Sequence, residues 1–319
     1  MIQSADYDVG CGALLDGQRS AHYRPLALDR LPELVPIRCF AHGCTSRHAG
    51  RDASGAYGAG ANDSTAGCQS WITRMSLRFT ITDWSAFAPG LASHDRWLDW
   101  ARAPCLPVGD DTPTVARMPV ILRRRLERIG RVALQPVYDC QLSHDGDIPH
   151  VFASRHGDLS RTYGMLQSLT RGEQLSPTAF GLSTHNAIAA LYGIACGMRG
   201  SHVAVSAGAT SAEAAVVEAL GLLNQGAREV IVVMYDSPLP DDYRVFADEP
   251  QCHYAWAWRI ALADSGSDVF SLVSGSGAAH LNTSRCLPHG LDVLRFVISG
   301  LDTMQFADRG RLWCWRRHG

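Results

Sequence analysis

The chain has 319 residues, of which 46% are hydrophobic and 19% charged, a globular composition long enough for one large domain or two ordinary ones. A formal net charge of −2 gives no general attraction for nucleic acid, so we expect no nucleic-acid partner. The sequence has no apolar run of about 18 residues or more and no signal-like start, which predicts no membrane span and a cytoplasmic protein.

The residues that usually hold metals or redox centres do not occur here in suitable patterns. None of the ten cysteines forms a C-x-x-C pair, which excludes the minimal zinc-ribbon and thioredoxin spacings. His144, His150 and His156 share no helical or strand face. Glycine-rich nucleotide loops, the G-x-S-x-G elbow and H-E-x-x-H are also absent from the sequence. We therefore expect neither a metal nor a cofactor.

The first 74 residues differ in composition from the rest of the chain. Residues 41–69 are a mixture of Gly, Ala, Ser, His, Asp and Arg that has almost no aliphatic periodicity. Such a segment cannot bury enough apolar area to offset its chain entropy. We interpret residues 1–74 either as a disordered tail or as an extension upstream of a true start at Met75, and residues 75–319 as the folded domain.

The first part of this domain predicts a strand, a turn and an amphipathic helix. Residues 77–82 alternate like a strand, and the sequence Ala88-Pro89-Gly90-Leu91 is typical of a turn. Apolar residues recur at helical spacing over residues 118–139, with Pro119 placed for a first turn. Arg123, Arg124 and Arg125 lie on this helix, either as a solvated stripe or as a docking patch for an acidic partner.

Strands and helices alternate through the remainder of the chain. We expect strands at 150–154, 203–205, 229–235 and 256–263, and helices at 159–170, 186–196, 211–223 and 291–299. The strand at 203–205 is predicted to be buried, and the apolar strand at 229–235 to be covered on both faces. Trp313 and Trp315 predict an edge strand with both indoles on one face. This alternation indicates an α/β fold.

The junction between the strand at 203–205 and the helix at 211–223 is the one chemically suggestive position. A sharp turn from a strand into a helix N-terminus places unpaired N–H groups and the helix dipole beside a nucleophile, which they activate. In this sequence the turn, Ser206-Ala207-Gly208-Ala209-Thr210, holds small and mostly inert side chains.

Several segments around this junction resemble, in order, the N-terminal half of a β-ketoacyl-acyl carrier protein synthase. They are Ser176-Pro177, Asn186, Gly197-Met198-Arg199-Gly200, Ser206 to Ala212, Gly226 and Val230 to Met234. The resemblance implies a thiolase-like fold of layered α-β-α type, truncated relative to full condensing enzymes. It also places Ala209 where the family has its cysteine nucleophile, and an alanine methyl cannot attack a thioester. Nothing in residues 240–319 resembles the family's two catalytic histidines, so we expect no catalytic residue.

The sequence from Met75 onward is more closely similar to the β-ketoacyl synthase chain length factors of bacterial aryl polyene pigment clusters. The matching segments are Ile81 to Ala86, Ala88 to Leu91, Trp97, Trp100, Ser176 to Phe180, His185-Asn186, Tyr235-Asp236, Leu239-Pro240 and Trp313 to Arg316. The resemblance implies a silent subunit that forms a heterodimer with an active ketosynthase and shapes its acyl tunnel.

Within such a heterodimer, the resemblance implies roles for several residues. The strand with Val203, Val205 and Ser206 would pair with the partner across the twofold axis. Thr178, Ala179 and Phe180 would line the partner's pocket and set its depth, the alternative being ordinary core packing. His185 is a further candidate of this region, and on its own residue type it is either a catalytic histidine or a hydrogen-bonded core histidine.

Two further hypotheses remain open from the residues alone. The chain could be a weak acyltransferase that uses another thiol such as Cys196, although Cys196 does not lie at a helix N-terminus that would lower its pKa. It could instead bind acyl carrier protein on its own. Carrier proteins are acidic, so Arg123, Arg124 and Arg125 would dock one by charge complementarity in either the heterodimer or the stand-alone form.

Overall fold

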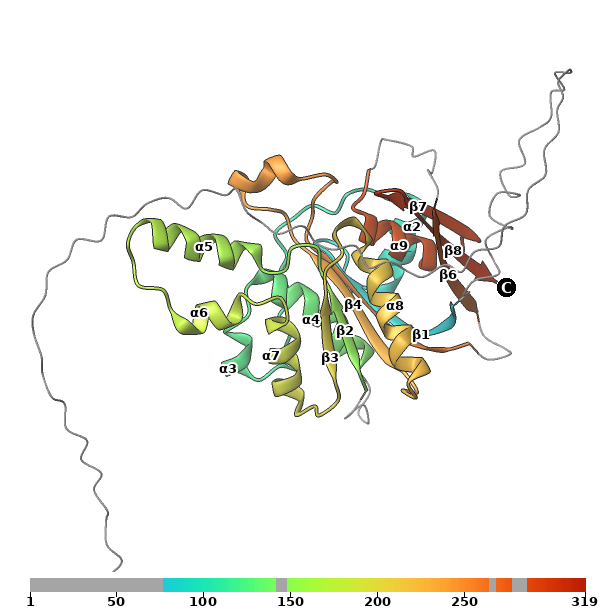
Figure 1. The fold of residues 1–319 in the computed structure, drawn as a ribbon, viewed down its shortest axis with the longest axis horizontal. Coiled ribbons are helices and arrows are strands. Elements are labelled where there is room, and N and C mark those ends of the chain that lie inside the picture. Colours follow the sequence, from blue (N-terminus) through green and yellow to red (C-terminus); the bar gives the residue numbers. More distant parts are fainter. Residues whose placement is uncertain (1–76, 142–147, 264–267, 277–285) are drawn as a thin grey trace, which may run out of the picture. The chain divides into compact units, whose positions relative to one another are not determined.

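A single mixed β-sheet organises the domain. The computed structural model describes residues 77–141, 148–263, 268–276 and 286–319, so the expected extension at residues 1–74 lies outside the described residues. Within them the strand order is β3-β2-β4-β5-β1-β6-β8-β7 (Figure 1). Strand β2 is parallel to β3 and β4, and the other pairs are antiparallel. The strands are β1 Leu77–Phe87, β2 His150–Ala153, β3 His202–Val205, β4 Val230–Asp236, β5 Tyr254–Leu262, β6 Val269–Ser276, β7 Thr303–Asp308 and β8 Arg311–His318.

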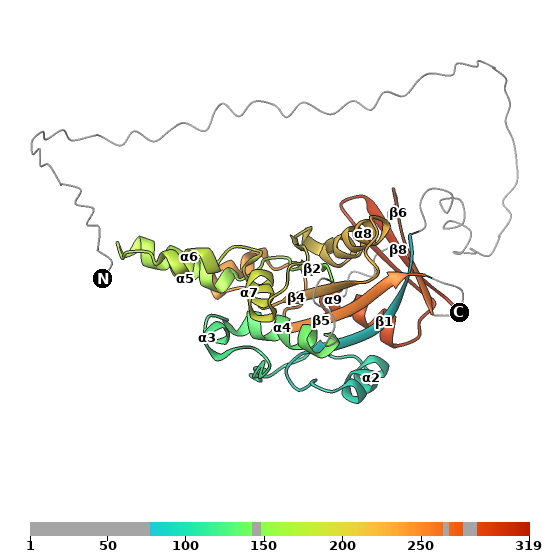
Figure 2. The same cartoon turned by 90° about the horizontal axis from the view of Figure 1, so that it is seen from below.

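Helices cover both faces of the sheet. Helices α4 (Arg128–Cys140) and α7 (Ala187–Cys196) bury their apolar side chains with one face, and α2 (His94–Arg102), α8 (Ser211–Asn224) and α9 (His289–Ile298) with the other. Figure 2 shows α4 and α8 on opposite sides of the strands. The central strand β4 is buried throughout because its alternate side chains enter the two cores. The layered α-β-α fold expected from the sequence is confirmed.

Two helices extend from this body next to the edge strand β3. Helices α5 (Leu159–Thr170) and α6 (Pro177–Leu182) contact each other, and α6 contacts α7, but neither contains a buried residue. We call residues 159–182 the α5–α6 arm; it lies beyond α7 and β3 in Figure 1. In the described part of the chain no helix has the length and apolar character needed to cross a membrane.

The predicted continuous helix at 118–139 is wrong. The chain forms a short helix α3 (Val120–Arg123), and α4 begins only at Arg128, after Glu127 has adopted an extended backbone. Tertiary contacts explain the break. Leu126 is buried in the core beneath α4, and the Arg128 guanidinium donates to the carbonyls of Gly109 and Asp111. These contacts outweigh local helix propensity, which is a weak determinant.

Two strand predictions also need correction. Strand β3 is only half-buried, because it is the last strand of the sheet and has a neighbour only on the β2 side among the described residues. Strand β8 is not an edge strand, because β6 and β7 flank it. Trp313 and Trp315 nevertheless point into the same core, as their alternation predicted. The predicted turn at 88–91 is confirmed by two hydrogen bonds between Ala88 and Leu91.

A buried carboxylate connects α8 to the C-terminal elements. Glu213, in the first turn of α8, accepts hydrogen bonds from His289 Nε2 (2.7 Å) and Trp315 Nε1 (2.9 Å) at its Oε1 atom. All three side chains are buried, and the His289 ring stacks on Phe306. Burial acts to raise the pKa of Glu213, but the charge and hydrogen bond of His289 outweigh it and hold this pKa below its ordinary value.

Removing this carboxylate should destabilise the fold strongly. We expect Glu213→Ala to lower the free energy of unfolding by about 3 to 5 kcal/mol, because it leaves two buried donors without an acceptor. Urea unfolding followed by circular dichroism measures the change. Glu218→Ala, half-buried on the same helix, is the control and should cost under about 1 kcal/mol. Equal losses in the two variants would contradict the role of Glu213.

Candidate functional site

Ala209, which the resemblance placed at the nucleophile position, lies in a short 3₁₀ turn, η1 (Gly208–Thr210), between β3 and α8. Gly208 adopts a left-handed backbone (φ 57°) that lets the chain turn sharply. Ser211 fixes the turn, because its Oγ accepts from the Ala207 N–H and donates to the Gly208 carbonyl. Ala209 is half-buried, and its methyl group packs against the core. At this turn the chain therefore presents a methyl group, and the assignment of a vacated nucleophile position stays a prediction.

An arginine holds the loop over the carboxyl ends of the parallel strands. Arg155, directly after β2, pairs with Asp248 (2.7 Å) and Glu249 (2.6 Å) of the loop between β4 and β5. Its backbone carbonyl accepts a hydrogen bond from Ser206 Oγ (2.9 Å), which joins it to the end of β3. These bonds join the segment after β2 to the end of β3 and to the loop between β4 and β5.

A buried aspartate lies below this network. Asp236, the last residue of β4, accepts hydrogen bonds from Ser154 Oγ (2.8 Å) and the Arg155 N–H (3.0 Å). Burial raises the pKa of Asp236 from 3.8 to about 7, although both hydrogen bonds act to lower it. Its carboxyl therefore changes protonation near neutral pH, at the point where three loops meet.

The predicted tunnel residues lie in the α5–α6 arm. Phe180, on α6, has 64% of its surface exposed, Thr178 is also exposed and Ala179 is half-buried. Ordinary core packing is therefore not the role of Thr178 or Phe180. His185 follows α6 and is half-buried, and its Nε2–H donates to the carbonyl of Val205, the last residue of β3 (3.0 Å). This bond places the end of the arm against the edge strand.

The three arginines do not form one continuous patch. Arg123 is half-buried, and its guanidinium reaches the carbonyl oxygens of Thr114 and Val115. Arg124 and Arg125 are exposed, and they follow Val120 and Ile121, two exposed apolar residues of α3. The structure thus leaves two of the three predicted docking arginines on the surface, next to apolar side chains.

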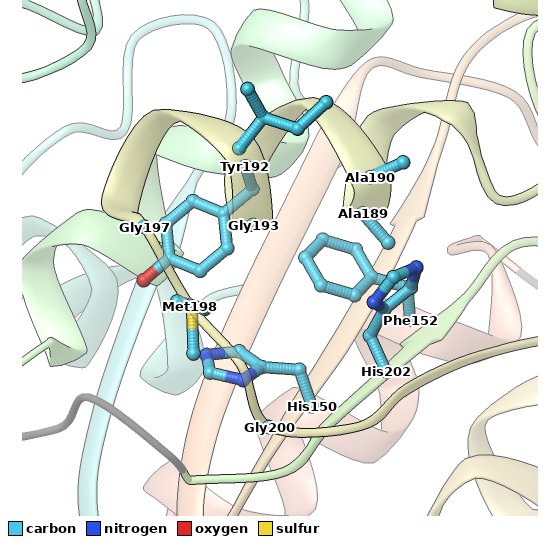
Figure 3. Close-up of a pocket in the computed structure, with 11 residues that line it drawn as sticks. His150, Phe152, Ala189, Ala190, Tyr192, Gly193, Gly197, Met198, Gly200 and His202 are labelled. Atoms are coloured by element: carbon cyan, nitrogen blue, oxygen red, sulfur yellow. The ribbon is translucent and has the colours of Figure 1, made fainter.

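Two cavities lie near the edge strand. A groove of about 440 Å³ separates α5 from α6 and includes Ala179. A second cavity, of about 360 Å³, lies between α7 and the strands β2 and β3, and Figure 3 shows the side chains around it. Its lining contains aromatic and small residues: His150, Phe152, Ala189, Ala190, Tyr192, Gly193, Ile194, Gly197, Met198, Gly200 and His202.

The described residues contain no cluster of three or more metal-ligating side chains. The buried thiols are also unsuited to nucleophilic chemistry. Burial raises the pKa of Cys252 to about 12 and that of Cys140 far above its ordinary value. Cys196 is the last residue of α7 and so does not lie at a helix N-terminus.

Sequence patterns alone did not identify Arg155, Glu213 or His289. The ion-pair partners of Arg155, Asp248 and Glu249, lie more than 90 residues away in the sequence, so no local pattern connects them. Glu213 is part of an alanine-rich helix and appears there as an ordinary surface residue. The segment holds two charges, Glu213 and Glu218, and no sequence signal separates the buried one from the half-buried one.

Comparisons with known proteins identify the family of this chain and structures with a similar fold. Residues 97–316 match the model of the beta-ketoacyl synthase N-terminal domain, and the chain belongs to this family. A chain in the structure of the ketosynthase ApeO in complex with its chain length factor ApeC, from Xenorhabdus doucetiae, is 29% identical. That match covers 76% of this chain and 100% of the other, with a TM-score of 0.65. No curated protein sequence matches this chain.

Two more distant structures share the fold. The ishigamide ketosynthase/chain length factor is 15% identical, with a TM-score of 0.50 over 62% of this chain and 67% of that one. A type II polyketide acyl-carrier protein in complex with its ketosynthase, AntDE:AntF, is 11% identical, with a TM-score of 0.50 over 64% and 70% of the two chains. The protein is thus ketosynthase-like and related to complexes of a ketosynthase with a chain length factor.

The buried Asp236 predicts a pH dependence of stability. Its folded-state pKa of about 7 lies above the ordinary 3.8, so the folded protein retains a proton that the unfolded chain releases between these values. Its contribution to stability therefore falls as pH rises from about 4 to 7. We measure the free energy of unfolding of Asp236→Asn and of wild type by urea unfolding at pH 4 and pH 8. We expect the value for the variant minus that for wild type to be about 2 to 4 kcal/mol more favourable to the variant at pH 8 than at pH 4. Identical pH profiles for the two proteins would contradict the assignment.

Proposed function

We propose that this protein is a non-catalytic ketosynthase-like subunit, a chain length factor that pairs with an active β-ketoacyl-acyl carrier protein synthase. The observation that carries the proposal is Ala209, which occupies the strand-to-helix turn where the family's cysteine is expected. The full coverage of one chain from a ketosynthase and chain length factor complex supports it. In this reading the partner performs the condensation in fatty acid or polyketide-type synthesis of an aryl polyene.

The outer side of β3 offers the pairing surface for the partner. The carbonyls of Ser201 and Val205 accept backbone hydrogen bonds from the β2 side. Because backbone groups alternate along a strand, those of His202 and Ala204 face away from the sheet. A strand from the partner can bond these groups and extend the sheet. The opposite edge, β7, ends at the charged residues Asp308 and Arg309, which protect an edge from pairing.

The α5–α6 arm adds an apolar surface to this edge. Leu166, Leu169 and Leu175 are exposed on the arm together with Phe180. A helix of 12 residues without a buried face is marginal in water, since tertiary packing supplies most helical stability. We infer that the partner subunit covers this arm. Thr178, Ala179 and Phe180 then lie between the two subunits, where their size sets the depth of the acyl tunnel.

The alternative of a weak acyltransferase with its own nucleophile has less support. Cys196 lies at a helix C-terminus, near the Tyr138 hydroxyl (3.7 Å) and the Gln141 side-chain oxygen (3.8 Å), and no cationic group contacts it in the described structure. Among its described neighbours it therefore lacks the helix N-terminus and the basic side chain that cysteine nucleophiles usually have.

A reconstituted elongation assay tests the proposal. The full chain, co-purified with a ketosynthase from its gene neighbourhood, is supplied with acyl- and malonyl-carrier protein, and covalent acyl label is followed on each subunit. We expect label on the ketosynthase only, product length that depends on this chain, and no such product without it. Ala209→Cys restores a thiol but not the missing histidines, so elongation should stay within twofold of wild type. Acyl label on this wild-type chain alone, removed by Cys196→Ser, would contradict the proposal.

The exposed arginines predict a salt-sensitive contact with acyl carrier protein. We expect the double variant Arg124→Glu/Arg125→Glu to weaken carrier-protein binding to the complex about tenfold at low salt, because it replaces attraction by repulsion. Surface plasmon resonance at two ionic strengths measures this. The control reverses two other exposed arginines, Arg102→Glu/Arg309→Glu, and should change the affinity less than twofold. An equal loss in both double variants would indicate a general charge effect and contradict a local docking patch.

A further inference from the structure

The cavity beneath α7 has a composition that suits an apolar guest. Phe152 and Tyr192 form aromatic walls, and Ala189, Ala190 and Gly193 leave the α7 side open (Figure 3). The lining residues include no carboxylate and no guanidinium. Its polar lining groups are the imidazoles of His150 and His202 and the Tyr192 hydroxyl, and the other lining residues are apolar or small, so a cavity of about 360 Å³ can accept a large apolar side chain.

The location of the cavity separates it from the vacated nucleophile position. His150 and His202, which line it, are the first residues of β2 and β3, whereas Ala209 follows the other end of β3. At the rim, Ile194 of α7 has 67% of its surface exposed. Its side chain therefore extends the apolar surface of the cavity mouth.

The cavity lies next to the outward-facing edge of β3. The outward-facing backbone groups of β3 include those of His202, and the His202 side chain is part of the cavity lining. A strand that pairs with β3 therefore runs past the mouth of the cavity. Its neighbouring segments are then the nearest source of an apolar side chain, and continuity with the pairing edge makes the partner subunit the occupant.

We propose that this cavity is an anchor pocket that receives a large apolar side chain of the partner ketosynthase and carries a major share of the heterodimer affinity. This inference rests on the proposed function, because the partner is the one that pairs with β3. Buried apolar anchors in well-packed pockets are the side chains that usually dominate interface affinity.

Filling the cavity from within tests the pocket. Gly193 lines the cavity, its backbone is helical, and a Cβ at this position would meet no atom within 4 Å. Gly193→Leu therefore occupies the cavity without a clash at its Cβ, and it also replaces a poor helix former. Ala190→Phe, one turn earlier, blocks the same space. The matched control is Gly221→Leu on α8, at an exposed helical glycine whose Cβ also meets nothing within 4 Å, whereas Gly193 is half-buried.

The affinity of the full chain for the ketosynthase is measured by isothermal titration calorimetry or by subunit exchange. We expect Gly193→Leu and Ala190→Phe to raise the Kd at least tenfold, and Gly221→Leu to stay within twofold of wild type. Circular dichroism of the free variants verifies that they are folded. Unchanged Kd values in both cavity variants, with wild type binding normally, would overturn the anchor pocket and leave the proposed function intact.

Other outcomes identify a different occupant. If wild type binds no ketosynthase but forms a homodimer that Gly193→Leu dissociates, the occupant is a second copy, and the proposed heterodimer fails as well. If a fluorescent fatty acyl probe binds the free chain and Gly193→Leu abolishes only this binding, the cavity holds an acyl chain, and the anchor pocket is overturned.

Discussion

The architecture depends on the buried carboxylate of Glu213. Through one oxygen it binds His289, 76 residues away, and Trp315, 102 residues away, and so it joins α8 to α9 and β8. Because Glu213 lies in the first turn of α8, these bonds also fix the start of that helix and the η1 turn that precedes it. Ala209 therefore lies in a turn directly before a helix whose first turn is bonded to the C-terminal part of the chain.

The two ends of the sheet differ in a way that bears on function. At one end, β6, β8 and β7 extend the sheet, with α9 packed on the same core as α8. At the other end, β3 is half-buried, and the α5–α6 arm and the cavity beneath α7 lie beside it. Exposed apolar side chains of the arm and of α7 thus occur on the side of the domain where the sheet ends in β3. The free energy of covering them is available to a partner that both pairs with the strand and packs against the arm.

Local patterns predicted the central elements well. A strand buried on both faces is continuously apolar, and a helix buried on one face has apolar residues at helical spacing. The apolar segment that became β4 and the helices α7 and α8 follow from such patterns. Strand β7 carries no strong pattern. Only Phe306 and Ala307 are buried, and they are neighbours in the sequence, so apolar and polar residues do not alternate along it. The break before Arg128 depends on carbonyls of the preceding loop, which no helical periodicity reveals.

The site was predictable only where the family resemblance supplied it. Ala209 and the residues from Thr178 to Phe180 came from matched segments, whereas Arg155 and Asp236 acquire their environment from loops far apart in sequence. The cavity at Gly193 could not be foreseen either, since a small residue in a helix indicates close packing as readily as open space. Only the assembled sheet shows that this side of α7 faces a hollow.

The most direct test of a silent subunit that completes its partner's sheet is amide hydrogen exchange of the full chain, alone and with the ketosynthase. The account predicts that the amides of His202 and Ala204, which face outward from β3, become strongly protected in a 1:1 complex, together with those of the α5–α6 arm. Rapid exchange at both β3 amides in a stable complex would contradict it.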